Sequence, residues 1–354
     1  MKRRTFIKNS VPYLAGTTFF PNFFSPENTS AELNSGKPKH QDLIIGHNDF
    51  KYKIDLNWGA LNASFYPVND CHEMVQDSQG RILLLTNHTK NNIIVYDKSG
   101  QLIEVWGTDY PGAHGLTLNV ENGEDFLYIA DNSRHEVIKT TLDGQVVMTL
   151  PFPAESGKYE KRDQYIPTET AIAPNGDIYV ADGYGLQYIL HYSSKGELLN
   201  IFGGKGDEEN HFDNAHGICI DGRSGDPTLI ITARQQNKFK RFSMDGKLLD
   251  VIHLPGAFVC RPVIHGENIF AATIWSGPDK LPNTGFISIL DKNNRLVAAP
   301  GGSKPVYENG KLTPMHQTIK IFQHPHDVCV DDDENLYVAQ WNSGKTYPIK
   351  LVRV

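Results

Sequence analysis

Apolar residues recur along this chain in short runs that are separated by polar turns. The clearest runs read RILLLTNHT (81–89), DFLYIADNS (125–133), DIYVADGYG (177–185), TLIITARQQ (228–236), NIFAATIWS (268–276) and NLYVAQWNS (335–343). They are rich in β-branched and aromatic residues, and no long segment has a helical period, which favours an all-β fold. Tight Gly or Asn turns follow the third strand of these repeats, for example KSGQ (98–101), MDGK (244–247) and KNNR (292–295). Six copies of a four-stranded unit predict a six-bladed β-propeller.

The sixth copy is short by one strand, because NLYVAQW is followed only by TYPIKLVRV (346–354). The segment FKYKIDLNWG (50–59), upstream of the first copy, has the character of a strand and no place in another blade. We therefore predict that the ring is closed by this N-terminal strand, which becomes the outer strand of the last blade. The alternative is a disordered chain end.

The N-terminus carries a second specific pattern. Lys2-Arg3-Arg4-Thr5-Phe6-Ile7-Lys8 resembles a twin-arginine (Tat) export signal, and a modest apolar stretch follows it. We predict an export signal over residues 1–30, a linker over 31–48 and the propeller over 49–354. The Tat machinery is then an expected partner, and a periplasmic or extracellular (secreted) location is expected. The alternative is a chance arginine pair on a tail.

Composition excludes several classes of partner. The formal net charge of −7 argues against nucleic acid and acidic membranes, and no apolar run after residue 30 approaches the roughly 18 residues of a membrane span. With 39% apolar residues, the 354-residue chain can bury a large core. The four cysteines do not resemble a disulfide framework, since Cys219 and Cys329 occupy equivalent places in non-adjacent blades and are too far apart to bridge. We therefore expect buried free thiols: Cys71, Cys219, Cys260 and Cys329.

The starts of the six innermost strands supply the candidate chemistry. In blade order they are His72, His114, Thr168, His216, Arg261 and His326. Alternate blades of a sixfold ring are about 120 degrees apart, so the histidines of blades two, four and six should converge. Three neutral imidazoles that leave one tetrahedral position open are typical of a catalytic zinc site. The alternative is that these histidines only hydrogen-bond across the channel.

The stretch Pro167–Tyr184, with Ala113-His114-Gly115, Ala215-His216-Gly217 and Pro325-His326-Asp327, resembles peptidyl-α-hydroxyglycine α-amidating lyases, which are six-bladed propellers of the NHL type. The resemblance implies that His114, His216 and His326 bind zinc and that Tyr184 is the catalytic base. It also implies a structural calcium ion on Asp327 and the backbone carbonyls of Met74 and Leu116. Zinc would lower the pKa of the substrate hydroxyl, Tyr184 would take the proton, and the C–N bond would break.

The chain departs from that family at two places. The family's carboxylate-binding arginine is missing, since the aligned stretch reads Leu85-Thr86-Asn87-His88. The disulfide beside the tyrosine is missing too, because Gly185 and the Tyr165-Ile166 pair occupy those positions. Two further channel groups can serve an anion, and Arg261 is a candidate replacement for the lost catalytic guanidinium. The other group, His72, is a possible fourth ligand that would close the metal site.

These features predict a metal-dependent, lyase-like propeller that acts in its channel on a small-molecule or peptide α-hydroxy amide, a hemiaminal or a sugar-derived carbinol. One alternative is a non-enzymatic NHL-type propeller that binds a protein or glycan. Another is a calcium-dependent sugar lactonase, which needs carboxylate or Asn ligands at inner-strand starts; only Glu169 and Asp327 qualify. Phosphate-binding Gly loops, dinucleotide fingerprints and Gly-x-Ser-x-Gly elbows are absent from the sequence.

Overall fold

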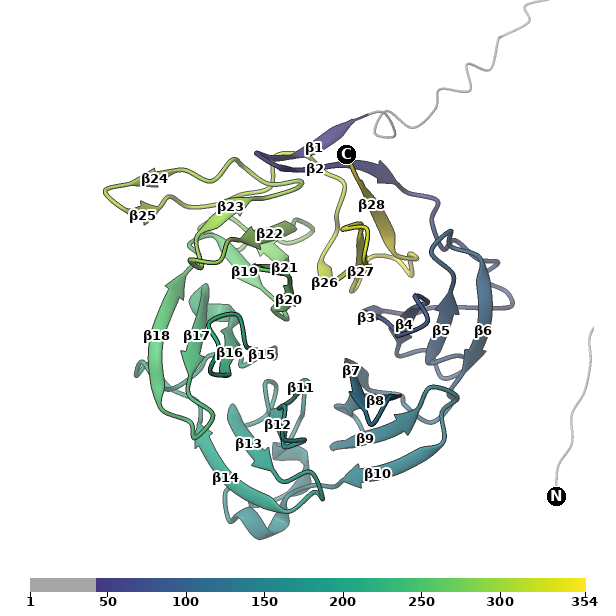
Figure 1. The fold of residues 1–354 in the computed structure, drawn as a ribbon, viewed down its shortest axis with the longest axis vertical. Helices are drawn as coiled ribbons and strands as arrows, with labels where there is room; N and C mark the ends of the chain where they lie inside the picture. Colours follow the sequence, from purple (N-terminus) through teal and green to yellow (C-terminus); the bar gives the residue numbers. More distant parts are fainter. Residues whose placement is uncertain (1–42) are drawn as a thin grey trace, which may run out of the picture. The chain divides into compact units, whose positions relative to one another are not determined.

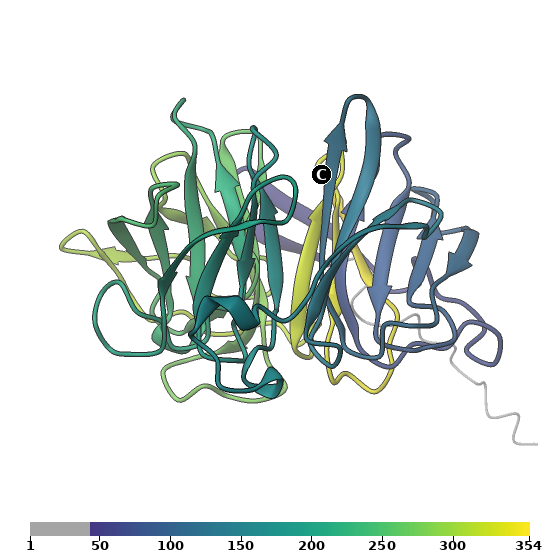
Figure 2. The same cartoon turned by 90° about the horizontal axis from the view of Figure 1, so that it is seen from below.

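The computed structural model describes residues 43–354, which form seven antiparallel sheets, and six of them are arranged as blades around a central channel (Figure 1). Each of the six apolar runs of the sequence forms the second strand of a blade, which confirms the predicted all-β, six-bladed propeller. The predicted Tat signal lies outside the described residues. Figure 2 shows the ring from the side, with the strands running between its two faces.

The first three blades have four strands each. Blade one consists of β3 (Cys71–Gln76), β4 (Ile82–Thr86), β5 (Ile93–Tyr96) and β6 (Leu102–Trp106). Blade two consists of β7 (Ala113–Glu121), β8 (Glu124–Asp131), β9 (Glu136–Thr141) and β10 (Val146–Leu150). Blade three consists of β11 (Glu169–Ile172), β12 (Ile178–Ala181), β13 (Tyr188–Tyr192) and β14 (Leu198–Gly203). The short 3-10 helices η1 (Ala154–Ser156) and η2 (Arg162–Gln164) lie in the connection between blades two and three.

The last three blades are less regular. Blade four consists of β15 (Ile218–Asp221), β16 (Thr228–Ala233), β17 (Lys238–Phe242) and β18 (Leu248–His253), with η3 (Arg234–Gln236) after β16. Blade five consists of β19 (Ala257–Val259), β20 (Val263–His265), β21 (Asn268–Ser276), β22 (Phe286–Leu290) and β23 (Leu296–Ala298). A hairpin of β24 (Tyr307–Glu308) and β25 (Lys311–Leu312) precedes blade six, whose own strands are β26 (Pro325–Val330), β27 (Leu336–Gln340) and β28 (Ile349–Arg353).

The N-terminal strand closes the ring, as predicted. β2 (Phe50–Asp55) pairs antiparallel with β28, with Ile54 opposite Leu351. A further strand, β1 (Ile44–His47), pairs with the outer side of β2, so the last sheet has five strands. The side chains of Tyr52 and Ile54 are buried against blades five and six. β1 starts at Ile44, within the segment predicted as a linker.

The core lies between neighbouring blades. Alternate residues of β4 face opposite neighbours: Leu83 and Leu85 pack against blade two, whereas Ile82 and Leu84 pack toward blade six. Both faces of a blade are therefore covered, which explains why the second strands read as continuous apolar runs without polar alternation. Burial of each such side chain contributes about 1.5 to 3 kcal/mol.

The prediction of free thiols is confirmed, and the prediction that they are buried is confirmed for three of the four cysteines. All four cysteines are free; three are buried and Cys219 is half-buried. The only helices in the described part of the chain are three short 3-10 turns, and none of them is long and apolar enough to cross a membrane.

Candidate metal centre and active site

Three channel histidines are placed by β-bulges. In β3, Cys71 pairs with Thr86 and Glu73 pairs with Leu85, so His72 is an extra residue without a partner. The same shift places His114 between the paired residues of β7 and His326 between those of β26. A bulge interrupts the strict alternation of a strand and re-aims the extra side chain, here toward the channel.

The glycines of the two Ala-His-Gly segments allow close contact between blades. A Cβ on Gly115 would lie 2.5 Å from the carbonyl oxygen of Thr168, and one on Gly217 would lie 2.5 Å from the Cα of Arg261. The first contact matters for the site, because the Thr168 carbonyl accepts a hydrogen bond from Nδ1 of His114 at 2.9 Å. Glycine is therefore required for the blade next to His114 to hold its ring.

The structure brings His114, His216 and His326 together. Their ring centroids are 4.8 to 4.9 Å apart in all three pairs. His72 joins them, at 4.8 Å from His114 and 4.9 Å from His326. All four side chains are at most 5% exposed. The channel thus holds a group of four imidazoles, of which three come from alternate blades.

These imidazoles are neutral and suited to bind a metal. Burial lowers the pKa of His72 to about 3 and lowers the pKa values of the other three well below 6.5. Nδ1 of His114 and of His326 donates to a backbone carbonyl, which leaves Nε2 of each ring unprotonated and able to accept a hydrogen bond or bind a metal. Nε2 of His326 is buried without a hydrogen-bond partner.

Ligand atoms within 4.8 Å of one another form two overlapping sets, His72 with His114 and His326, and Cys260 with His216 and His326. Nitrogen and thiolate donors of this kind suit zinc and similar transition metals. The residues present therefore fit a divalent transition metal. Cys260 was not predicted as a site residue; burial raises the pKa of its thiol to about 11.

Tyr184 contacts this group directly. Its hydroxyl oxygen is 3.1 Å from Nε2 of His114 and 3.1 Å from Nε2 of His216. Burial of the hydroxyl raises the pKa of Tyr184, and the guanidinium of Arg234 opposes that rise. The phenol is accordingly protonated at neutral pH in this metal-free arrangement.

The turn after β12 presents Tyr184. The buried carboxylate of Asp182 accepts hydrogen bonds from the backbone N–H groups of Ile166 (2.6 Å) and Leu186 (2.7 Å) and from the hydroxyl of Tyr159 (3.0 Å). The backbone N–H of Tyr184 donates to the carbonyl of Ile166 at 3.3 Å. These bonds join the two segments that the family's disulfide would join.

Arg234, which contacts the Tyr184 hydroxyl, was not predicted from the sequence either. It follows β16, is 4% exposed, and points its Nη2 at the Tyr184 hydroxyl (3.4 Å) and its Nη1 at Sγ of Cys260 (3.7 Å). Its guanidinium also lies over the ring of Trp275, 5.1 Å from the centroid. Its Nε has no hydrogen-bond partner. Because both partners are uncharged near neutral pH, this buried cation lies beside the histidines with no ion pair to an acidic side chain among residues 43–354.

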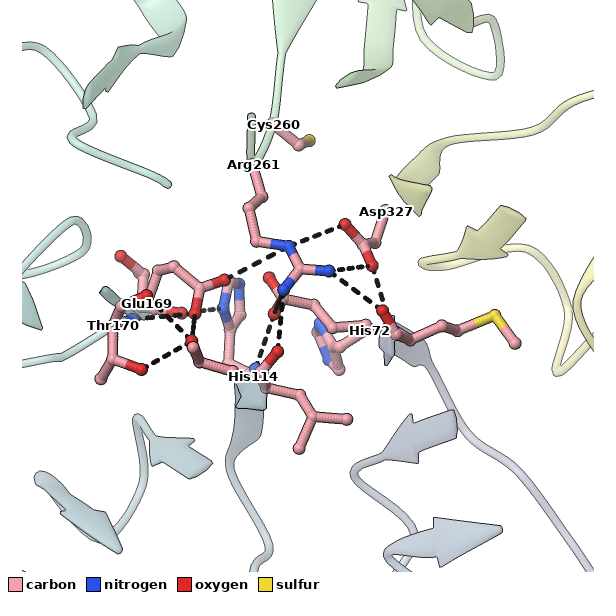
Figure 3. Close-up of polar contacts among 12 residues, drawn as sticks. His72, His114, Glu169, Thr170, Cys260, Arg261 and Asp327 are labelled. Atoms are coloured by element: carbon pink, nitrogen blue, oxygen red, sulfur yellow. Dashed lines mark hydrogen bonds and ion pairs between the residues drawn. The ribbon is translucent and has the colours of Figure 1, made fainter. Parts of the chain in front are cut away.

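Arg261 points its guanidinium between Asp327 and Glu169 (Figure 3). Its guanidinium donates to both carboxylate oxygens of Asp327 (3.1 and 2.8 Å) and to the carbonyls of Leu116 (2.8 Å) and Met74 (3.0 Å). These are the oxygens predicted to hold calcium. Calcium needs the same oxygens at about 2.3 to 2.6 Å, whereas here they accept hydrogen bonds from the guanidinium, so the arrangement does not fit the predicted calcium ion. Arg261 was the predicted replacement for the lost catalytic guanidinium, but its guanidinium is hydrogen-bonded within this cluster. The arginine that contacts Tyr184 is Arg234.

Two buried glutamates complete the cluster. Glu73 and Glu169 lie 3.5 and 3.8 Å from the guanidinium, and both side chains are at most 1% exposed. Burial raises the pKa values of both carboxyl groups, against the opposite effect of Arg261. Sequence reasoning named Glu169 but not Glu73, although Glu73 directly follows His72 at an inner-strand start. Thr168, the remaining predicted channel residue, acts through its carbonyl on His114.

Asn87, in the stretch Leu85–His88 of blade one, lies beside the histidine group. Its Nδ2 donates to Asp70 (3.1 Å) and lies 3.4 Å from Nε2 of His72. Blade one therefore offers the site an imidazole and an amide but no positive charge.

The fold and the histidine group define a six-bladed β-propeller with a candidate metal centre in its channel. No family model matches the chain. It is similar to peptidyl-alpha-hydroxyglycine alpha-amidating lyase 1 of Drosophila melanogaster, with 26% identity over 363 residues, 95% of this chain and 60% of that protein. The chain thus spans less than two thirds of this relative.

Human NHL repeat-containing protein 3 is 24% identical over 307 residues, covering 77% of this chain and 86% of that protein. A solved gluconolactonase from Xanthomonas campestris has a TM-score of 0.59 at 12% identity, covering 88% of this chain and 95% of that structure. The structural likeness concerns the fold alone. The two sequence comparisons confirm the resemblance to amidating lyases and NHL-repeat propellers.

Proposed function

We propose that this protein is a metal-dependent, lyase-like propeller that cleaves the C–N bond of an α-hydroxy amide, a hemiaminal or a related carbinol. One observation carries the proposal: the Tyr184 hydroxyl lies 3.1 Å from Nε2 of two histidines of the candidate metal centre. A group that can move a proton is thereby placed within hydrogen-bond reach of any hydroxyl bound beside those histidines.

His114, His216 and His326 would hold the metal, and each of the two close ligand sets, His72 with His114 and His326 and Cys260 with His216 and His326, supplies two of these three histidines. A divalent metal bound there would lower the pKa of a substrate hydroxyl. The buried surroundings exclude bulk water, since His114 and His216 are 1% exposed.

Cleavage of a carbinol next to nitrogen needs proton transfer at two atoms. The hydroxyl hydrogen leaves as a proton, and its electron pair becomes the second bond of the new carbonyl group. The C–N electron pair stays with the nitrogen, which takes up a proton and leaves as an amide. We assign the first proton transfer to Tyr184, whose hydroxyl faces the site; burial raises the pKa of this hydroxyl, and the guanidinium of Arg234 opposes that rise.

Arg234 also supplies a recognition element for the substrate. Its buried guanidinium has a free Nε donor and no charged partner in the site. A carboxylate on the substrate would accept a hydrogen bond from Nε and would supply the negative charge, because guanidinium pairs with carboxylates through charged hydrogen bonds. We propose that Arg234 binds the substrate carboxylate in place of the arginine that is missing from blade one.

The lactonase alternative is less well supported. It needs channel carboxylates that are free to bind a cation, whereas Glu73, Glu169 and Asp327 all face the guanidinium of Arg261. The likeness to the gluconolactonase concerns the fold alone and does not support lactonase activity. We also propose export to the periplasm or the exterior. This part rests on the predicted Tat signal alone, which lies outside residues 43–354.

The test is the metal content of natively purified protein, measured by elemental mass spectrometry. We expect about one transition-metal ion per chain in the wild type and none in His216→Ala. His265→Ala, which changes a half-buried histidine of β20 outside the four-histidine group, is the matched control and should keep the metal.

Metal-containing protein is then assayed with peptides that end in α-hydroxyglycine and with sugar-derived carbinols, by following the released carbonyl compound. Absence of a transition metal from the wild type would contradict the proposal and would favour a non-enzymatic propeller that binds a protein or glycan.

A further inference from the structure

Arg261 has the surroundings of a bound metal ion. Its guanidinium forms four hydrogen bonds, two to Asp327 and one each to the carbonyls of Met74 and Leu116. The carboxylates of Glu73 and Glu169 lie next to it, and all three acidic side chains are at most 1% exposed. Three buried carboxylates and two backbone carbonyls around one cation resemble the oxygen set of a hard-metal site.

The oxygens come from different parts of the ring. Glu73 and Met74 belong to blade one, Leu116 to blade two, Glu169 to blade three and Asp327 to blade six, while Arg261 itself enters from blade five. Five of the six blades therefore meet at this guanidinium, as Figure 3 shows for the labelled members. Without a cation at this point, buried carboxylates of three blades would repel one another.

The backbone of blade five is shaped to deliver this side chain. Val259 pairs with Thr273, and Val263 pairs with Phe270, so four steps along the inner strand oppose three steps along β21. The extra residue lies in Cys260-Arg261-Pro262, where proline cannot donate to the ladder. Gly217 gives the Arg261 backbone room from blade four.

Water can reach the cluster from the side away from the histidines. A cavity of about 410 Å³ is lined by residues that follow the cluster along the inner strands, including Val75, Leu118 and Val330, and Arg261 forms part of its wall. A dissolved cation could enter through this cavity if the guanidinium were removed.

We infer that Arg261 takes the place of a divalent metal ion on the channel axis, so that the propeller holds its blades together without calcium. The inference is independent of the proposed activity, since it concerns the stability of the fold and not the histidine group.

The test is thermal unfolding of the full chain with and without millimolar calcium or magnesium. The melting temperature of the wild type should not change with either ion. Arg261→Ala should melt on the order of 10 °C lower, because it leaves buried carboxylates without their partner. Calcium should restore part of that loss, and magnesium should restore less, since it demands a smaller and more rigid site.

Arg241→Ala is the control, because Arg241 pairs with the exposed Asp250 on the surface of blade four and should be nearly neutral, with or without calcium. If Arg261→Ala cannot be recovered folded, Arg261→Lys replaces it. The lysine keeps the charge but loses the two-pronged contact, so it should fold and melt below the wild type.

Three results would overturn the inference: stabilisation of the wild type by calcium, an Arg261→Ala variant that gains nothing from calcium, or an Arg261→Lys variant as stable as the wild type. None of these readouts depends on catalysis, so the inference and the proposed function fail separately.

Discussion

Tyr184 is the residue at which solvent and the buried histidines meet. Its side chain is 38% exposed, whereas His114 and His216, which its hydroxyl contacts, are 1% exposed. A substrate that enters from solvent therefore meets the phenol before it meets the imidazoles. This position suits the proton transfer that we propose for the hydroxyl.

The corresponding prediction is that Tyr184→Phe lowers kcat on a cleavable carbinol by about 100-fold or more, the usual contribution of a positioned proton-transfer group. Metal content should stay at the wild-type level, because the change removes one oxygen that is not in the proposed ligand set. Steady-state kinetics and elemental analysis on the same preparation check both parts. An unchanged kcat would remove Tyr184 from the mechanism, and loss of metal would make it a ligand.

At the scale of the element, the Asp182–Leu186 turn decides where the phenol lies. A Cβ on Gly183 would be 2.2 Å from the carbonyl oxygen of Ala215 and 2.5 Å from Oγ1 of Thr168. Ala215 belongs to the segment before His216 in blade four, and Thr168 belongs to the start of the turn's own blade, so the turn packs tightly between the inner strand of blade three and blade four. Burial raises the pKa of Asp182 to about 7, while the bonds from Ile166, Leu186 and Tyr159 favour its ionised form.

We predict that Gly183→Ala displaces this turn and reduces kcat at least tenfold, because a 1 Å misplacement of a catalytic group is enough for losses of that order. Gly222→Ala is the matched control, since nothing lies within 4 Å of its added Cβ, and its kinetics should equal those of the wild type. Wild-type kcat in Gly183→Ala would show that the turn tolerates movement and that Tyr184 does not need this position.

At the scale of the propeller, channel burial makes stability depend on pH. The pKa of His72 is about 3 in the folded protein, against 6.5 for the free side chain. As pH falls below 6.5, His72 takes up a proton in the unfolded chain but stays neutral in the folded protein. The free energy of unfolding therefore decreases with decreasing pH. Glu73 and Glu169, whose pKa values are raised, act in the opposite direction.

We therefore predict that, in metal-free protein, stability falls less between pH 7 and pH 5 in His72→Gln than in the wild type, by about 2 kcal/mol. The glutamates and the other histidines are common to both proteins, so the difference isolates His72. Urea unfolding after chelator treatment measures it. Parallel pH profiles for the two proteins would show that His72 is not held neutral by the fold.

Much of this architecture could be predicted from the sequence, because the signals are local and repeated. Continuous apolar runs such as 81–86 follow from blades that are covered on both faces, and Gly or Asn turns mark the hairpins. The short sixth copy and the strand at residues 50–55 predicted the ring closure. The convergence of His114, His216 and His326 followed from sixfold geometry alone, since alternate blades must face one another.

The identity of the groups that meet in the channel could not be predicted in this way. Arg234 follows a second strand and Arg261 an inner strand, yet the first reaches Tyr184 and the second reaches Asp327. A long arginine side chain can point to either end of the channel, and its direction depends on bulges and carboxylates contributed by other blades. The sequence alone therefore suffices for the ring and its histidines, whereas the filling of the channel results from contacts between residues far apart in the chain, such as Met74 and Arg261.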